Sequence, residues 1–164
     1  MNSKKLFIWG FLFVSVIGTL LHFVYEWSGN NSIVRLFAPW NESTWEHMKL
    51  LFFPMLALVL FLFFKLPEQS PIPVALSFGT LVGLALIPIL FYTYTGVLGF
   101  SVMAIDIAIF YISVLGAFLI GWFLKDNREL ANRRGLLLTC LVILAILFFI
   151  FSYYPPGIGL FQEP

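Results

Sequence analysis

Long apolar stretches alternate with short polar ones along this chain. The apolar stretches cover residues 6–27, 45–64, 73–95, 100–124 and 135–154. Each is close to the length of about 20 helical residues that crosses a bilayer. The pattern predicts an all-α integral-membrane protein, in which a polytopic bundle of five transmembrane helices forms one membrane domain over residues 1–164.

The segments between these stretches have the composition of turns and loops. Residues 28–44 contain a Ser-Gly-Asn-Asn-Ser run, residues 65–72 contain two prolines, and residues 125–134 are rich in charged side chains. Gly, Pro, Asn and Ser end helices and form turns. We therefore expect short connections between neighbouring antiparallel helices.

The composition agrees with a membrane location. Hydrophobic residues make up 61% of the 164 residues and charged residues only 10%, against about a quarter charged in a soluble domain. The net charge of +1 gives no reason to expect a nucleic-acid partner. Cys140 is the single cysteine, so it has no partner for an intrachain disulfide or a paired-cysteine metal site.

The basic residues predict the orientation of the bundle. Cytoplasmic loops are enriched in Lys and Arg. With the N-terminus inside, the cytoplasmic side holds seven of the nine basic residues, namely Lys4, Lys5, Lys65, Lys125, Arg128, Arg133 and Arg134. We therefore predict a multi-pass protein of the cell membrane with its N-terminus inside and its C-terminus outside. Residues 28–44 then form an extracytoplasmic loop, and residues 65–72 and 125–134 form cytoplasmic loops.

A stripe of polar side chains follows the first predicted helix. Ser15, Thr19, His22 and Glu26 are spaced by three or four residues and so share one helix face. Ionisable groups are costly against lipid, so we expect this face to point into the bundle. Ser15 and Thr19 could simply form hydrogen bonds within or between helices. His22 and Glu26 are candidate metal ligands.

The start of the second predicted helix holds a second polar group. Ser43 and Glu46 have the spacing of a capping box, and Asn41 is an alternative cap. Glu42 could be an exposed acid that the helix dipole favours. A capping role does not account for His47, which we predict to be a metal ligand. Asn41, Glu42 and Glu46 are candidate catalytic residues, with the capping alternative left open for Glu46.

The helix predicted over residues 100–124 contains an isolated carboxylate. Asp106 has no basic residue within a helical turn, and an intramembrane carboxylate is a candidate functional group. We predict Asp106 as a further catalytic residue; the alternative is a protonated carboxyl in a structural hydrogen bond. Pro54 and Pro88 lie at similar depth and each frees a backbone carbonyl. They could open a cavity, or they could be ordinary membrane prolines.

Two further features concern packing. Ala75, Gly79 and Gly83 repeat at four-residue spacing, and such small-residue faces allow close helix contact. They could serve packing within the chain or formation of a homo-oligomer. The tail from Pro155 onward could fold back over the outer end of the bundle or be disordered.

The polar segments also carry a resemblance. The pattern from His22 and Glu26-Trp27 to the run NESTWEHMK over residues 41–49 resembles a family of small integral-membrane proteins of unknown function from Gram-positive bacteria. The resemblance covers essentially the whole chain. It implies the same topology and the same polar residues, and it names no reaction.

Three classes of function fit these residues. Two imidazoles with nearby carboxylates could hold a divalent metal such as zinc and leave a position for water. The chain would then be a membrane-embedded hydrolase or transferase acting on a lipid, a lipid-linked group or a membrane-embedded peptide. A non-metal acid/base enzyme is a variant of this hypothesis. A cation- or proton-coupled transporter and an accessory or assembly subunit with a structural polar cluster are the alternatives.

Overall fold

Five long helices dominate the computed structural model, which describes residues 2–164. They are α1 (Ser3–Trp27), α2 (Thr44–Lys65), α3 (Ile72–Leu98), α4 (Met103–Leu124) and α6 (Arg134–Tyr153). Each is long and apolar enough to cross a membrane. The short helices η1 (Val34–Leu36), α5 (Arg128–Ala131) and η2 (Gly159–Phe161) lie in the connections and the tail. Residues 2–164 contain no strand, so the predicted all-α architecture with five membrane-length helices is confirmed.

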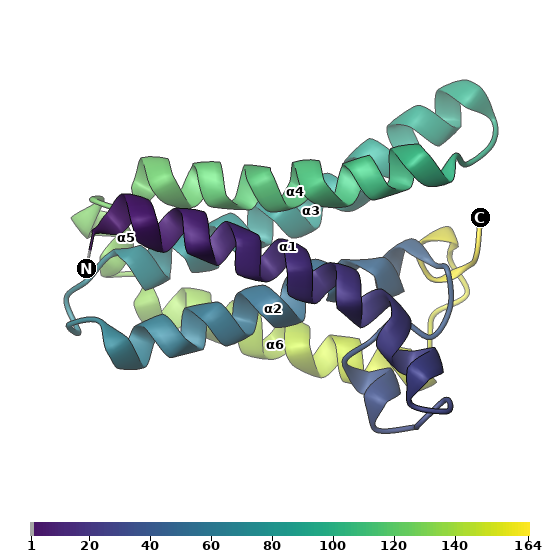
Figure 1. Ribbon diagram of the computed structural model, residues 1–164, viewed down its shortest axis with the longest axis horizontal. Coiled ribbons are helices and arrows are strands. Elements are labelled where there is room, and N and C mark those ends of the chain that lie inside the picture. The colour runs from purple at the N-terminus through teal and green to yellow at the C-terminus, as the bar shows by residue number, and fades with distance from the viewer. Residues whose placement is uncertain (1) are drawn as a thin grey trace.

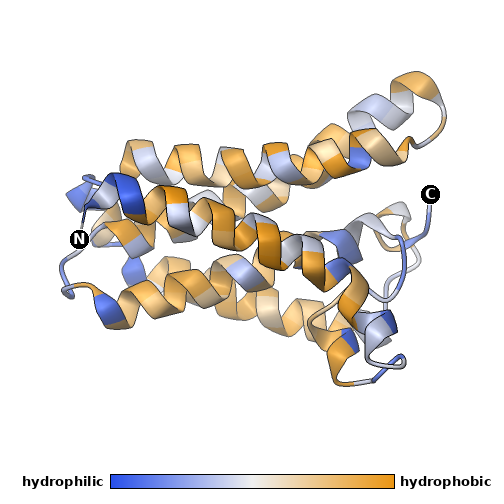
Figure 2. Cartoon of the chain, viewed as in Figure 1, coloured by the Kyte–Doolittle hydropathy of each residue, from blue (hydrophilic) through white to orange (hydrophobic). Residues whose placement is uncertain are grey.

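The long helices run up and down in one bundle. The N-terminus, the α2–α3 connection and α5 lie at one end, whereas residues 28–43, the α3–α4 turn and the C-terminus lie at the other (Figure 1). Apolar residues follow the length of the helices, and strongly polar residues gather mainly at the two ends (Figure 2). This distribution fits a bundle whose middle lies in hydrocarbon and whose ends meet water.

The core is rich in aromatic side chains. Phe52 and Phe148 are fully buried and their ring centroids lie 4.9 Å apart, with Leu51 and Met55 buried beside them. Many other large apolar side chains point outward along the helices, and Phe64 is 89% exposed. A helix that is apolar on every face is typical of a membrane span, so this outer surface is suited to contact with lipid tails.

The small-residue face of α3 packs within the chain. Gly79 and Gly83 lie against α4, and a Cβ at Gly79 would lie only 2.2 Å from the backbone oxygen of Ala117. Ala75 is buried on the same helix. Of the two predicted roles for this face, close packing within the chain is the one that the contacts with α4 support.

The α3–α4 turn is set by a glycine. Gly99 adopts φ = 82° and caps α3, and its N–H donates to the carbonyl of Thr95. Glycine takes this left-handed conformation without a steric cost. Because Gly99 ends α3 and α4 begins only at Met103, Asp106 lies in the first turn of α4. The prediction began this helix at residue 100. Asp106 is therefore three residues closer to the start of the helix than predicted.

The C-terminal tail folds back onto the bundle. The ring of Phe161 in η2 lies 4.9 Å from Trp45 of α2 and 5.2 Å from Phe151 of α6. Trp45 is itself buried against Phe148. Of the two predicted alternatives for the tail, folding back over this end of the bundle is the one observed.

Candidate metal centre

Three potential metal ligands from separate parts of the sequence meet at the end of the bundle that holds residues 28–43. His22 belongs to α1, His47 to the first turn of α2, and Glu42 to the loop that enters α2. One ligand atom from each lies within 4.8 Å of the other two. The Nε2 atoms of His22 and His47 are 3.3 Å apart, and Glu42 Oε2 lies 3.3 Å from His47 Nε2 and 4.0 Å from His22 Nε2.

The local structure of the loop explains this convergence. At the end of α1, Gly29 and Asn30 have φ values of 69° and 61°. Their N–H groups donate to Glu26 O and Tyr25 O, a Schellman pattern that ends the helix sharply. The chain then turns back toward the bundle, and Ser43 caps α2 by accepting from the N–H of Glu46. The last turns of α1 and the first turn of α2 therefore lie side by side.

The backbone fixes the orientation of one imidazole. Nδ1 of His47 lies 3.0 Å from the carbonyl oxygen of Ser43. Since a carbonyl only accepts, Nδ1 carries the proton, and Nε2 of the neutral ring then has a free lone pair. A metal-binding histidine commonly donates its other N–H to such an oxygen. In the neutral ring, Nε2 of His47 is therefore an electron-pair donor that faces Nε2 of His22 and the carboxylate of Glu42; in the protonated ring, Nε2–H can donate to Glu42.

The spacing of the donor atoms suits a small transition-metal ion. Zinc binds imidazole nitrogen and carboxylate oxygen at about 2.0–2.2 Å, so two ligands at a tetrahedral angle lie roughly 3.3 Å apart. Two of the three separations equal this value, and the third is 4.0 Å. Two histidines and one carboxylate are also a ligand set found in catalytic zinc sites, where water takes the fourth position. The Glu42 side chain is 64% exposed, so the centre is open to solvent.

The charge state of Glu42 agrees with a ligand role. The hydrogen bond that the Glu42 carboxylate accepts from Nε2–H of protonated His47 is the main cause that holds the pKa of Glu42 below its usual 4.5, and the charges of His47 and His22 act in the same direction. Partial burial opposes this shift without cancelling it. Glu42 is therefore ionised near neutral pH, as a carboxylate ligand must be.

The remaining predicted site residues take other places. Glu26 lies in the last turn of α1, is exposed, and is not a member of the cluster of His22, Glu42 and His47. Asn41 accepts a hydrogen bond from the N–H of Ser43 at 3.1 Å and so shapes the turn that presents Glu42. Glu42, predicted as a catalytic residue, is the carboxylate that lies with His22 and His47 in the place expected for Glu26.

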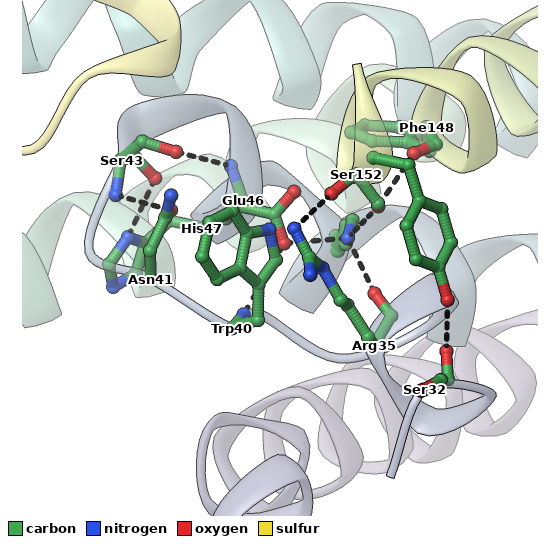
Figure 3. A network of polar contacts seen from close by, with 11 residues as sticks. Ser32, Arg35, Trp40, Asn41, Ser43, Glu46, His47, Phe148 and Ser152 are labelled. Carbon is green, nitrogen blue, oxygen red and sulfur yellow. Dashed lines mark hydrogen bonds and ion pairs between the residues drawn. The ribbon is translucent and has the colours of Figure 1, made fainter. Parts of the chain in front are cut away.

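Glu46 points away from the metal centre into a buried ion pair. Its side chain is 2% exposed, and Oε2 accepts from Nζ of Lys49 at 2.6 Å and from the N–H of Trp40 at 3.4 Å. Only the first half of the predicted capping box forms, because Glu46 reaches Trp40 rather than the N–H of Ser43. Figure 3 shows Glu46 directed toward Arg35 and Ser152, and the imidazole of His47 on the other side of the same turn.

Asp106 forms a separate polar pair. The hydroxyl of Tyr94 on α3 donates to Oδ1 of Asp106 on α4, and it accepts from the N–H of Val102 at 3.0 Å. The carboxylate is half-buried. Asp106 lies outside the cluster of His22, Glu42 and His47, and its side-chain partner is Tyr94.

Several functional contacts were not predicted. Lys49 follows Glu46 by three residues, and nothing in the local sequence indicates that it is fully buried. Neither the Ser43 carbonyl as a partner of His47 nor the Tyr94–Asp106 hydrogen bond has a local sequence signal. Both depend on contacts that only the folded loop and the α3–α4 turn create.

Comparison with known proteins identifies the chain at the level of a family. A family model described as a family of unknown function (DUF6512) matches residues 1–164. No curated protein and no solved structure matches the chain.

Proposed function

Since the chain belongs to DUF6512, a family of unknown function, we propose a function for it from the geometry of the metal centre. The protein is a multi-pass membrane enzyme that binds one divalent metal ion of the zinc class through His22, His47 and Glu42. It uses that ion to hydrolyse, or transfer a group from, a lipid or another membrane-embedded substrate. The meeting of three ligand atoms within 4.8 Å carries this proposal.

The ligand set supports catalysis over a purely structural metal. Structural zinc sites are closed by four protein ligands, whereas three ligands leave a position for water. A bound divalent ion lowers the pKa of that water and polarises a carbonyl or phosphoryl oxygen. The partly exposed side chains of His22, His47 and Glu42, at 38%, 28% and 64%, leave room for a substrate.

A second carboxylate supports the same reaction class. Asp106, at the same end of the bundle, is half-buried and held by Tyr94. In this position it would accept or return a proton during attack by water, as general acid–base catalysis requires. Glu46 takes no part in this proposal, since its carboxylate is buried against Lys49.

The position of the centre supports a membrane substrate. It lies at the end of a bundle whose flanks expose large apolar side chains to the surroundings. A lipid headgroup sits at this level of a bilayer, where the helix ends meet water. With the N-terminus inside, as the distribution of basic residues indicates, the centre would face outward from the cell membrane.

Metal analysis of the purified protein tests this proposal. We expect about one zinc ion per chain in detergent-purified wild type and loss of that ion in His22→Ala and His47→Ala. Glu26→Gln is the matched control, because Glu26 lies on the same helix as His22 but outside the cluster; this variant should keep the metal. Equal metal content in all four proteins, or no affinity in the wild type, would exclude the metal centre.

A product assay then tests the catalytic part. Wild type and Glu42→Gln are incubated with vesicles of total membrane lipid, and the lipids are compared by mass spectrometry. We expect a lipid product that needs both the metal and Glu42. A protein that binds zinc at the three residues and changes no lipid would favour a structural metal in an accessory subunit.

A further inference from the structure

A buried ion pair lies directly behind the metal centre. Lys49 is 0% exposed, and its Nζ donates to Glu46 Oε2 at 2.6 Å, Ser152 Oγ at 2.5 Å and Arg35 O at 2.9 Å. All three protons of the ammonium group therefore have acceptors. Ser152 Oγ in turn donates to the carbonyl of Phe148, so the hydroxyl accepts from Lys49 and donates within α6.

These contacts attach the loop of residues 28–43 to two helices. Arg35 donates to the carbonyl of Ser152 at 2.6 Å, and its guanidinium stacks 3.7 Å from the ring of Trp40. The hydroxyl of Tyr153 donates to the carbonyl of Ser32 at 2.7 Å. Figure 3 shows how α6, the loop and the start of α2 converge on this network.

The network reaches Glu42 through the backbone on both sides. The N–H of Trp40, two residues before Glu42, donates to Glu46 Oε2. The side chain of Ser43, just after Glu42, accepts from the backbone N–H of Glu46. Glu42 therefore lies between one residue bonded to the Glu46 carboxylate and one bonded to the Glu46 backbone. The carbonyl of the same Ser43 also orients the imidazole of His47.

Stability alone does not explain such a pair. Removing two charges from water costs several kcal/mol per ion, and apolar residues of similar volume often replace a buried pair at no loss. Here Glu46 Oε1 is buried without a hydrogen-bond partner, which adds to that cost. The pair instead fixes the distance between the loop and α2 close to Glu42, the loop residue that faces the two histidines.

We propose that Glu46 and Lys49 are positioning residues for the metal centre, and that they act by holding Glu42 within reach of His22 and His47. This inference rests on the proposed metal-binding function. It assigns the pair no contact with the metal or the substrate. It predicts that loss of the pair weakens metal binding only as long as Glu42 is there to be positioned.

A double-mutant cycle tests this dependence. Zinc affinity is measured by titration calorimetry for wild type, Glu42→Gln, Glu46→Gln/Lys49→Met, and the triple variant, all in nanodiscs. Changing both charges at once avoids an unpaired buried ion. We expect the paired substitution to lower affinity by about 10–100-fold, as loss of supporting groups around metal ligands does, and to have no further effect once Glu42 is replaced. An equal loss in both backgrounds, or none in either, would overturn the proposal.

Two further variants show whether a change in zinc affinity comes from the ion pair and not from misfolding. Ser152→Ala removes one acceptor from Lys49 and keeps the ion pair, and it should lower affinity in the same direction by a smaller factor. Glu68→Gln changes the exposed contact with Arg134 at the opposite end of the bundle, and should leave zinc affinity unchanged. If the paired variant does not fold, Ser152→Ala with and without Glu42→Gln provides the same cycle.

Hydrogen exchange separates this inference from the proposed function. Without metal, the paired substitution should raise amide exchange in residues 36–43 and leave the middles of the five long helices protected. Raised exchange together with no zinc binding by the wild type would overturn the metal function and keep the positioning of the loop. Zinc binding by the wild type with unchanged exchange in the loop would overturn the positioning and keep the metal function.

Discussion

The Nε2 atoms of His22 and His47 face each other at 3.3 Å although 25 residues separate them in the sequence. The antiparallel contact of α1 and α2 accounts for their approach, and the carbonyl of Ser43 accounts for the direction of one ring. A proton or a metal ion between these nitrogens and the carboxylate of Glu42 would hold the three side chains together. Replacing one of these three side chains therefore changes the interactions of the other two.

The first prediction concerns acid and Glu42. Its pKa is lower in the folded protein than the usual 4.5, mainly through the hydrogen bond with His47. Its contribution to stability is therefore complete above about pH 4.5 and is lost as the pH falls through the lower folded value. Because Glu42 is 64% exposed, we expect this contribution to be only about 0.2–1 kcal/mol.

Thermal unfolding in detergent with a chelator present measures this effect. Wild type should melt above Glu42→Gln at mildly acidic pH, where His47 is protonated and Glu42 is ionised, and the difference should shrink as the pH falls below the usual 4.5 of a Glu carboxyl. In a His47→Ala background the same Glu42→Gln substitution should make no pH-dependent difference, because the main cause of the shift is gone. A difference in melting temperature between wild type and Glu42→Gln that persists at low pH would contradict a stabilising role for the ionised Glu42 carboxylate.

The sequence was sufficient to predict much of the fold. Apolar stretches of membrane length and the turn residues between them are local signals, and α1 to α4 and α6 follow them with ends displaced by a few residues. His22 and His47 could be paired from topology alone, since each lies near the same end of its helix. Their convergence is confirmed by the distance between them.

The third ligand could not be predicted in the same way. Glu26 shares the helix face of His22, and that spacing favoured it over Glu42. Whether Glu26 or Glu42 lies beside the histidines depends on how residues 28–43 fold. Arg35 in that loop and Lys49 on α2 both bond to Ser152 on α6, more than 100 residues away, and a local pattern cannot connect them.

The second prediction concerns the contact of α3 and α4. Gly79→Ala would place a Cβ at 2.2 Å from the backbone oxygen of Ala117, which cannot move aside as a side chain could. We expect a loss of stability of about 1–3 kcal/mol, the usual cost of overpacking. Gly96→Ala on the same helix is the control, because nothing lies within 4 Å of its Cβ position. It should be neutral or stabilising by about 0.5–1 kcal/mol, and equal melting temperatures for the two variants would refute the packing argument.

The third prediction concerns Tyr94 at the tip of the α3–α4 hairpin. Tyr94→Phe removes the donor to Asp106 and the acceptor for the N–H of Val102. A half-buried carboxylate without its partner costs about 1–3 kcal/mol, so this variant should unfold more easily. Tyr92→Phe, at an exposed position nearby, should behave like wild type. The comparison is made by thermal unfolding of detergent-purified proteins, and equal stability of the two variants would count against a structural role for the pair.

The fourth prediction concerns the orientation of the bundle. Seven basic residues lie on the side that holds the N-terminus, so the positive-inside rule places the metal centre on the outer face. In a Cys140→Ser background, Ser32→Cys probes the loop before α2 and Gln69→Cys probes the α2–α3 connection; both positions are exposed. A membrane-impermeant maleimide applied to intact cells should label Ser32→Cys, and should label Gln69→Cys only after permeabilisation. The background protein without a cysteine should stay unlabelled in both conditions.

The reverse labelling pattern would place His22, His47 and Glu42 on the cytoplasmic face, and the substrate would then be sought in the inner leaflet.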